Sequence, residues 1–316
     1  MLKTTTASEP AAQIAASPAI ETRELAKHYG RIIALDGLTM TVPRGEVFGF
    51  LGPNGAGKTT AVKLLVGLAR PSSGAAWILG APIGDRRTRR RIGYLPELFR
   101  YQGWLSAREV LALHCELAGL ERGSWSDEVD RALVTVGLAA RANDRVETFS
   151  KGMQQRLGLG VALLGRPEVV FLDEPTSALD PVGRHDVREI IRGLKAQGTT
   201  VFLNSHLLGE VELVCDRVAV VDRGRVIAIG TIPELLGEVN TVRVRATGLD
   251  AAATAALRRF GRIETEDDWY VVRGIVDDAV PDLVAEIVRL GGRVHAVEPR
   301  QVTLEDRFLQ LLAKED

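Results

Sequence analysis

The sequence lacks the features that mark secreted, membrane-spanning or strongly basic nucleic-acid-binding chains. Its 316 residues include only two cysteines, Cys115 and Cys215, which lie far apart and show no metal-binding spacing. So few thiols in so long a chain indicate a reducing compartment, and hence the cytoplasm. No apolar run approaches the ~18 residues that cross a bilayer, and the N-terminus lacks the apolar core of a secretory signal. The net charge of −1 gives no global field that would favour nucleic acid or an acidic membrane.

The overall composition is that of an ordinary globular protein, with 46% hydrophobic and 26% charged residues. The length predicts about two domains. Residues 1–19 are rich in Thr, Ala, Ser and Pro, and we expect them to form a disordered tail. Residues 20–238 alternate apolar strands with helices, which predicts an α/β fold with a parallel core. Residues 240–316 change in texture and predict a small C-terminal α+β accessory domain.

Hydrophobic periodicity places the main elements. Strands are predicted at residues 20–29, 32–42, 44–51, 75–80, 92–97, 169–172 and 199–204, with a hairpin at 218–229. Helices are predicted at residues 61–68, 106–120, 126–136, 150–164 and 182–196, so that residues 98–165 form a helical subdomain. In the C-terminal part, strands are expected near 242–245, 270–272 and 294–297, and helices at 251–260, 280–290 and 304–312.

One glycine-rich loop between a predicted strand and a predicted helix fits the phosphate-binding pattern G-x-x-x-x-G-K-[ST]. It consists of Gly52, Pro53, Asn54, Gly55, Ala56, Gly57, Lys58, Thr59 and Thr60. Its glycines let successive N–H groups point at one anion. The following helix adds its positive dipole end. Lys58 would meet the β- and γ-phosphates, and the Thr59 hydroxyl would ligate Mg²⁺.

A second candidate site feature, this one acidic, lies more than a hundred residues downstream of the glycine-rich loop. The short apolar strand at residues 169–172 ends in Asp173 and Glu174. Buried unpaired carboxylates are costly, and a bound cation would neutralise them. We therefore expect Asp173 to hold the Mg²⁺ water shell and Glu174 to polarise an attacking water.

Two other features leave alternatives open. Tyr29 ends a strand upstream of the loop, where it could stack on a purine base or simply pack, and spacing alone does not decide. Residues 86–91 contain five arginines, which could indicate nucleic-acid binding. Because no aromatic residues are interleaved with them, we favour a solvated helix face.

Several motifs in fixed order then give a specific resemblance. Phe149-Ser150-Lys151-Gly152-Met153-Gln154-Gln155-Arg156 precedes Leu172-Asp173-Glu174-Pro175-Thr176-Ser177-Ala178-Leu179-Asp180-Pro181, and Ser205-His206 follows. Over about residues 20–234 the chain resembles the ATPase subunit of ATP-binding cassette (ABC) transporters. The resemblance implies a P-loop NTPase core that binds ATP and Mg²⁺ and hydrolyses the ATP.

The resemblance also implies residue roles. Residues 52–59 match the Walker A loop, Asp173 the Walker B aspartate, Glu174 the catalytic glutamate and His206 the switch histidine that contacts the γ-phosphate. Tyr29 matches the adenine-stacking aromatic. Ser150 and Gly152 match the signature motif, and Asp180 ends the loop that links the two sites; these act across a head-to-tail dimer. Glu97 stands where the family commonly has a Mg²⁺-binding Gln, and Lys151 replaces a common Gly.

The resemblance further implies partners and a place in the cell. A second copy of the chain and a separate transmembrane permease are expected, with no nucleic acid, so the chain would be cytoplasmic and peripheral on the inner face of the cell membrane. Residues 98–104, which include Phe99, Tyr101 and Trp104, could dock the permease or pack in the core. The Ser-Lys-Gly-Met signature and residues 303–309 resemble the drug, antibiotic and lipid exporter branch.

Two other functions are compatible with a cassette ATPase. A soluble, non-transport enzyme could act on nucleic acid or ribosomes. However, only about ninety residues separate the P-loop from the signature, too few for the long coiled coils of chromosome and repair relatives, and only one P-loop is present. A nucleotide-sensing regulator would turn ATP over slowly, and Glu174 speaks against it.

Overall fold

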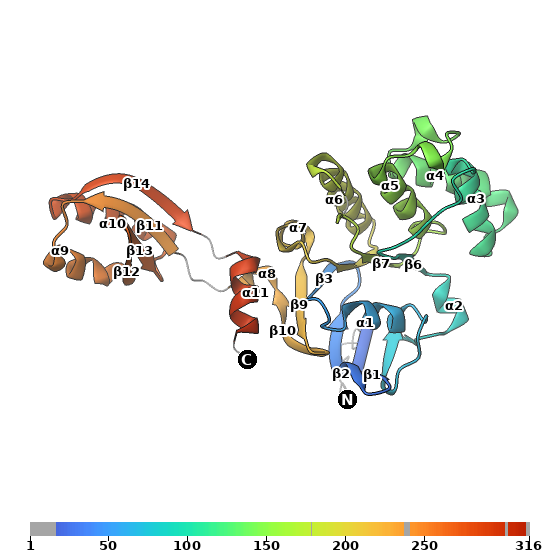
Figure 1. Ribbon diagram of the computed structural model, residues 1–316, viewed down its shortest axis with the longest axis horizontal. Coiled ribbons are helices and arrows are strands. Elements are labelled where there is room, and N and C mark those ends of the chain that lie inside the picture. The colour runs from blue at the N-terminus through green and yellow to red at the C-terminus, as the bar shows by residue number, and fades with distance from the viewer. Residues whose placement is uncertain (1–16, 178, 237–240, 301–302, 314–316) are drawn as a thin grey trace, which may run out of the picture.

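The computed structural model describes residues 17–177, 179–236, 241–300 and 303–313 (Figure 1). Most of the tail expected at residues 1–19 lies outside the described residues. The last residue of that expected tail, Ala19, is fully buried, and its N–H donates to the Val42 carbonyl over 2.9 Å. The packed chain therefore includes residues that the composition assigns to the tail.

A six-stranded sheet forms the centre of the main body, defined here as residues 17–236, in the order β10-β9-β3-β8-β7-β6. All neighbouring pairs run parallel except β9 and β10. The strands are β3 (Val47–Leu51), β6 (Ile92–Leu95), β7 (Val169–Asp173), β8 (Thr200–Asn204), β9 (Arg217–Asp222) and β10 (Arg225–Thr231). The predicted α/β class with a parallel core is confirmed.

The central strands are buried along their whole length because their two faces belong to two different apolar clusters. In β7, Val170 and Leu172 lie in one cluster, whereas Val169 and Phe171 lie in the other. Successive side chains of a strand point to opposite faces, so a sheet covered on both sides reads as a continuous apolar run. The strands β3 and β8 divide their side chains between the same two clusters.

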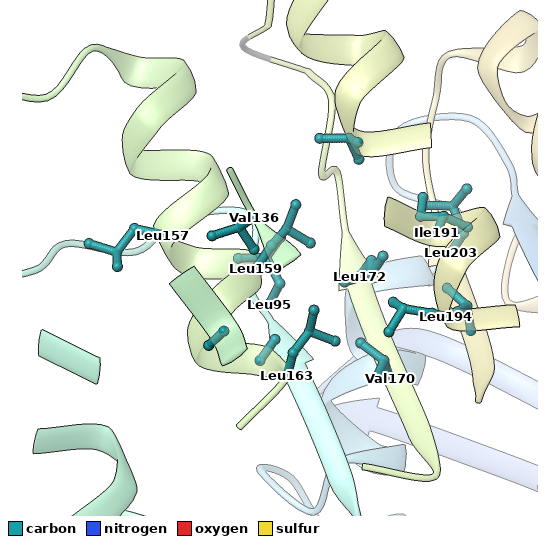
Figure 2. Packing of buried hydrophobic residues seen from close by; sticks show 14 of the residues in the cluster. Leu95, Val136, Leu157, Leu159, Leu163, Val170, Leu172, Ile191, Leu194 and Leu203 are labelled. Atoms are coloured by element: carbon teal, nitrogen blue, oxygen red, sulfur yellow. The ribbon is translucent and has the colours of Figure 1, made fainter. Parts of the chain in front are cut away.

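Two helices cover one face of this sheet (Figure 2). They are α5 (Lys151–Ala162) and α6 (Pro181–Ala196). In Figure 2 the side chains of Leu163 and Leu194 lie on either side of β7, next to Val170. Helix α5, which precedes the Asp173-Glu174 pair in the sequence, and helix α6, which follows it, therefore pack on the same face of β7.

An antiparallel sheet in the order β2-β1-β4-β5 covers the other face, together with α1. Its elements, with two short helices, are β1 (Ile20–Tyr29), β2 (Ile32–Val42), α1 (Lys58–Leu65), β4 (Ser73–Ile78), β5 (Ala81–Pro82) and α2 (Arg86–Arg89). The arginine-rich segment is thus a single helical turn, as the solvated-helix interpretation predicts. Its buried residue is Thr88, and the arginines are exposed.

The predicted helical segment contains α3 (Ala107–Leu117), α4 (Trp125–Thr135) and α5, with 3₁₀ turns at Arg122–Ser124, Ala139–Arg141 and Val146–Thr148. Ser106 and Glu109 form a capping box, which fixes the start of α3. Before α3, Phe99 and Tyr101 pack partly buried against the core, with ring centroids 5.3 Å apart, whereas Trp104 is 68% exposed. The core-packing interpretation therefore holds for Phe99 and Tyr101 but not for Trp104.

Residues 241–300, which we call the accessory unit, form a second antiparallel sheet, β12-β13-β11-β14, with its own apolar cluster. Its elements are β11 (Thr241–Thr247), α9 (Ala251–Ala256), β12 (Arg262–Glu266), β13 (Trp269–Arg273), α10 (Val280–Arg289) and β14 (Arg293–Arg300), with 3₁₀ turns at Leu257–Phe260 and Asp277–Ala279. The sequence missed β12, because its charged and polar residues hide the alternation.

The last described helix, α11 (Leu304–Leu312), returns to the main body (Figure 1). It packs against α7 (Leu208–Val214) and α8 (Ile232–Leu236), two short helices that the sequence did not predict. Leu304 is 1% exposed and belongs to the apolar cluster of the main body. The sequence grouped this helix with the accessory domain, whereas its packing ties it to the central sheet.

Candidate functional site

Four neighbouring parallel strands, β3, β8, β7 and β6, end at one edge of the central sheet, and predicted site residues follow those ends. β3 leads into the glycine-rich loop, and Asp173 and Asn204 stand opposite each other at the ends of β7 and β8. The strand ends surround a pocket of about 440 Å³. It is lined by Gly52, Pro53, Asn54, Lys58, Thr59, Glu97, Asp173, Glu174, Ser177, Asn204, Ser205, His206, Leu208 and Phe308.

The loop between β3 and α1 has a backbone that requires glycine. Gly55 and Gly57 have φ angles of 85° and 98°, in the left-handed region. A Cβ atom on Gly52 would lie 2.2 Å from the Val221 carbonyl oxygen, so a side chain has no room there. No side chain caps α1 at Gly57. The N–H groups of the first turn therefore remain available to an anion, next to the positive end of the helix.

Lys58 is the first residue of α1, and its side chain lies across the loop. The residue is 8% exposed, and Nζ donates to the carbonyls of Gly52 and Pro53 over 2.7 and 3.1 Å. Burial lowers the pKa of Lys58, and the carboxylates of the pocket, Glu174 foremost, oppose that effect. The ammonium group is thus fixed by the same loop whose N–H groups would hold a phosphate.

Asp173 is buried at the end of β7, with 1% exposure, and the Asn204 amide donates to its Oδ1. Burial raises the pKa of Asp173; the hydrogen bond from Asn204 lowers it, and the nearby charges of Glu97 and Glu174 raise it further. The other amide atom, Asn204 Oδ1, is buried and has no hydrogen-bond partner among the described residues. The pocket therefore contains an excess of buried oxygen atoms over donors.

These oxygen atoms fit a hard divalent cation. Carboxylate oxygens are ligands of Mg²⁺, and Asp173, Glu97, Asn204 and Thr59 all contribute oxygen-bearing side chains to this one pocket. Among the described residues, no group of three or more His, Cys, Asp or Glu side chains could hold a metal ion by itself. Mg²⁺ usually keeps several waters and binds through one or two carboxylates plus substrate phosphates. The arrangement therefore fits a cation that arrives with a nucleotide.

Glu174 follows β7 directly and has a φ angle of 53°, a conformation that costs a non-glycine residue about 1–3 kcal/mol. Its N–H donates to the Asn204 carbonyl over 2.8 Å, which ties the strained residue to β8. The Glu174 Oε2 atom lies 2.8 Å from Nδ1 of His206, whose side chain is 55% exposed. A carboxylate held in this way beside an imidazole has the geometry to orient and deprotonate a water molecule.

Some predicted nucleotide-binding residues do not line the pocket. Gly55, Ala56, Gly57 and Thr60 shape the loop and the start of α1 instead. Tyr29 lies at the end of β1 and is 47% exposed, with Nζ of Lys27 4.8 Å from its ring centroid. Its ring is therefore not part of the apolar core, and one of its neighbours is a cation.

The residues predicted to act across a dimer also lie outside the pocket of their own chain. Ser150 is exposed at the N-cap of α5, and its Oγ accepts the Met153 N–H over 3.2 Å. Asp180 is exposed at the N-cap of α6, and its Oδ1 accepts the Gly183 N–H over 2.8 Å. Gly152, in the first turn of α5, has a helical backbone with ordinary surroundings. Neither α5 nor α6 therefore contributes a lining residue to this pocket.

The sequence missed five of the lining residues as site residues. Asn204 could have been found, because a polar side chain ending the strand next to β7 must meet Asp173 once the two strands pair. Ser177 and Ser205 sit in segments that the motifs already pointed to. Leu208 left no signal, since an apolar residue of a short helix reads as core. Phe308 lies in the segment 303–309 that resembles the exporter branch, but nothing in that segment indicates that it reaches the pocket.

The fold and the site together define a nucleoside triphosphatase of the P-loop class: a glycine-rich loop and a lysine at the end of one parallel strand, and adjacent acids at the end of another. The profile of the ABC transporter family matches residues 35–177. The chain belongs to this family and is an ATP-binding, ATP-hydrolysing subunit.

Similar proteins extend the match beyond the cassette. An uncharacterized ABC transporter ATP-binding protein of Nostoc is 40% identical, over 90% of this chain and 85% of the relative. The linearmycin resistance ATP-binding protein LnrL of Bacillus subtilis is 32% identical, over 93% of this chain and 98% of the relative. Both alignments cover more of this chain than the main body does, so the relatives are similar along the accessory unit as well.

A solved ATP-binding subunit of an ABC transporter has the same fold, with a TM-score of 0.63 and 32% identity over 69% of this chain and 91% of that chain. ATP-binding subunits of this family dimerise and work with membrane permeases. Among the helices that the structure describes here, none is both long enough and apolar enough to cross a bilayer.

Proposed function

We propose that two copies of this chain clasp ATP between them, head to tail, and that the closing and opening of this dimer drives a separate permease. Each nucleotide would lie between the glycine-rich loop of one copy and Ser150 and Gly152 of the other. The observation that carries the proposal is the placement of the α5 N-terminus. It is an exposed helix N-terminus, a feature that favours anions, and it does not line the pocket of its own chain.

Within each pocket the residues would divide the work. The loop N–H groups and Lys58 hold the phosphates, while Tyr29 stacks on the adenine. Glu174 accepts a proton from the water that attacks the γ-phosphorus, and His206 orients that phosphate. The bond to the β-phosphate breaks, which leaves ADP and phosphate. Thr59, Asp173 and Glu97 hold Mg²⁺ through oxygen atoms or waters, and the cation would neutralise phosphate charge.

The proposed transport direction is export of a drug-like, antibiotic-like or lipid-like substrate. LnrL, which aligns over nearly all of this chain, is named for resistance to linearmycin. The permease would dock on the segment between β6 and α3, where Leu98 is 87% and Trp104 is 68% exposed. Exposed large apolar residues of this kind are typical of interface anchors.

The proposal that each nucleotide lies between two copies, which we call the trans-site model, is tested by Glu174→Gln. This substitution removes the proton acceptor but keeps the size of the side chain, so ATP binds and is not hydrolysed. We expect a stable dimer with ATP and Mg²⁺ by light scattering, a monomer with ADP, and turnover reduced by about 10²- to 10³-fold. As a matched control, Glu189→Gln changes a half-exposed glutamate of α6 that pairs with Arg192. It should leave turnover unchanged and trap no dimer.

A Glu174→Gln protein that binds ATP and yet stays monomeric at saturating concentration would refute the trans-site model. Stimulation of wild-type ATP turnover by DNA or RNA would instead favour a cassette enzyme that acts on nucleic acid.

A further inference from the structure

Helix α11 brings a residue from the far end of the chain into the nucleotide pocket. Phe308 lines the pocket together with Leu208, at a site whose other lining residues are mostly polar or glycine. Both side chains are partly buried against the apolar cluster of the main body. The catalytic motifs make no use of either residue, although the sequence around residues 303–309 stood out as a motif.

The docking of α11 on the main body is specific rather than incidental. Thr303 and Asp306 form a capping box that fixes where the helix begins. The Leu304 side chain is fully buried, and its N–H donates to Oε2 of Glu212 in α7 over 3.1 Å. Burying a leucine contributes about 1.5–3 kcal/mol, so the helix has a defined seat on α7.

Helix α7 begins two residues after the histidine of the site. The Leu207 N–H donates to Oγ of Ser205 over 3.2 Å, and Glu210 of α7 pairs with Arg188 of α6 at 2.7 Å. The segment that carries His206 is therefore held on one side by β8 and on the other by α7. Because α11 packs on α7, its contacts extend this support to the part of the pocket next to Glu174.

We propose that α11 positions the switch segment, residues 205–208, with Phe308 as its positioning residue, so that seating of α11 and binding of the γ-phosphate favour each other. The proposal rests on the proposed role of His206 as the residue that contacts the γ-phosphate. In this proposal Phe308 acts through the switch segment and not on the reacting atoms: it lines the pocket together with Leu208, and both side chains pack against the apolar cluster of the main body. Only three residues of sequence, 301–303, separate β14 of the accessory unit from α11.

Coupling of this kind is reciprocal: if bound ATP stabilises the docking of α11, docked α11 raises the affinity for ATP by the same factor. The affinity for ADP, which lacks the γ-phosphate, should not change. In Phe308→Ala we expect the preference for ATP over ADP to shrink about five- to tenfold, within the usual range of coupling between binding sites. We also expect kcat to fall, because His206 would be less well positioned. ADP affinity should stay within about twofold.

Two further variants separate positioning from a general loss of structure. Phe308→Leu keeps an apolar side chain at the rim and should restore most of the ATP preference. Leu309→Ala changes the neighbouring residue of the same helix, which is 60% exposed, and should change neither parameter. A general loss of stability would lower ADP and ATP affinity alike, so the ratio of the two affinities is the informative quantity.

The unmutated chain gives an independent measurement, which is needed if Phe308→Ala fails to fold. Amide hydrogen exchange of residues 304–312 should be slower with a non-hydrolysable ATP analogue and Mg²⁺ than with ADP. Equal exchange with the two nucleotides, or an unchanged ATP preference in folded Phe308→Ala, would overturn the proposal. If Glu174→Gln still lowers turnover by about 10²- to 10³-fold in that case, the assignment of the catalytic residues stands and only the role of α11 is refuted.

Discussion

Two helices of this chain, α1 and α5, begin with a lysine that follows a small residue, but their N-termini differ in capping and in exposure. At α1, Gly57 offers no side-chain cap, and Lys58 is buried across the loop. At α5, Ser150 caps the helix itself, and Lys151 is exposed. The first N-terminus has no side-chain acceptor and lies beside the pocket, whereas at the second Ser150 accepts one N–H group and the helix end is open to solvent.

The difference separates an anion site that is complete within one chain from one that is proposed to need a second copy. The α1 site folds its charge, its glycines and its acids into one pocket, so a single copy can hold a nucleotide. The N-terminus of α5 is capped by Ser150 and exposed to solvent, so in the proposed dimer it would meet a phosphate bound to the other copy. Substitutions at equivalent positions of the two helices therefore test the comparison directly.

The largest contrast is expected between Lys58→Ala and Lys151→Ala. Lys58 supplies the charge at the phosphates and two hydrogen bonds that hold the loop, so its loss should abolish measurable nucleotide binding. Lys151 is exposed outside the pocket, so its loss should leave nucleotide affinity of the single chain unchanged. Titration with a fluorescent ATP analogue measures both, with circular dichroism as the control for folding. Undiminished binding by Lys58→Ala would contradict the P-loop role.

A smaller contrast is expected between Gly57→Ala and Gly152→Ala. A Cβ atom at Gly57 would meet the Ala34 carbonyl oxygen at 2.2 Å in a backbone with φ of 98°. This should destabilise the nucleotide-free protein by about 2–4 kcal/mol. At Gly152 the nearest atom would be 3.4 Å away, in Leu179, and the helical backbone suits alanine, so the effect should be within about 1 kcal/mol of zero. Denaturant unfolding without nucleotide decides, and equal losses at the two glycines would contradict the comparison.

The sequence predicted the α1 side of this comparison well, because its signals are local. Gly52, Gly57 and Lys58 fall within one loop whose backbone demands their residue types. Likewise, an all-apolar strand that ends in Asp173 and Glu174 predicts two carboxylates at the end of a buried strand. The predicted strand and helix positions follow from the same local periodicity, since the central strands are covered on both faces.

The rest of the site depends on contacts between distant segments, which periodicity does not encode. Asn204 meets Asp173 only because β7 and β8 pair in one particular register. Phe308 reaches the pocket only because α11 leaves the accessory unit and packs on α7, a helix too short to give a periodic pattern. Glu174 has a positive φ that no glycine announces, and its strain is compatible with the fold because β8 accepts its N–H.

The finest contrast separates the observed role of Ser150, as a cap within its own chain, from its proposed role as a contact for the partner's nucleotide. Ser150→Ala removes the side chain that accepts the Met153 N–H and should destabilise the nucleotide-free protein by about 1 kcal/mol. Ser150→Asp keeps a good cap, so stability should be retained, but its negative charge would face a phosphate in the dimer. In a Glu174→Gln background we therefore expect Ser150→Asp to unfold at the same denaturant concentration as its parent and yet to remain monomeric with ATP. If Ser150→Asp dimerised with ATP as readily as its parent, the exposed end of α5 would have no partner phosphate to meet, and the two helix N-termini would differ in capping alone.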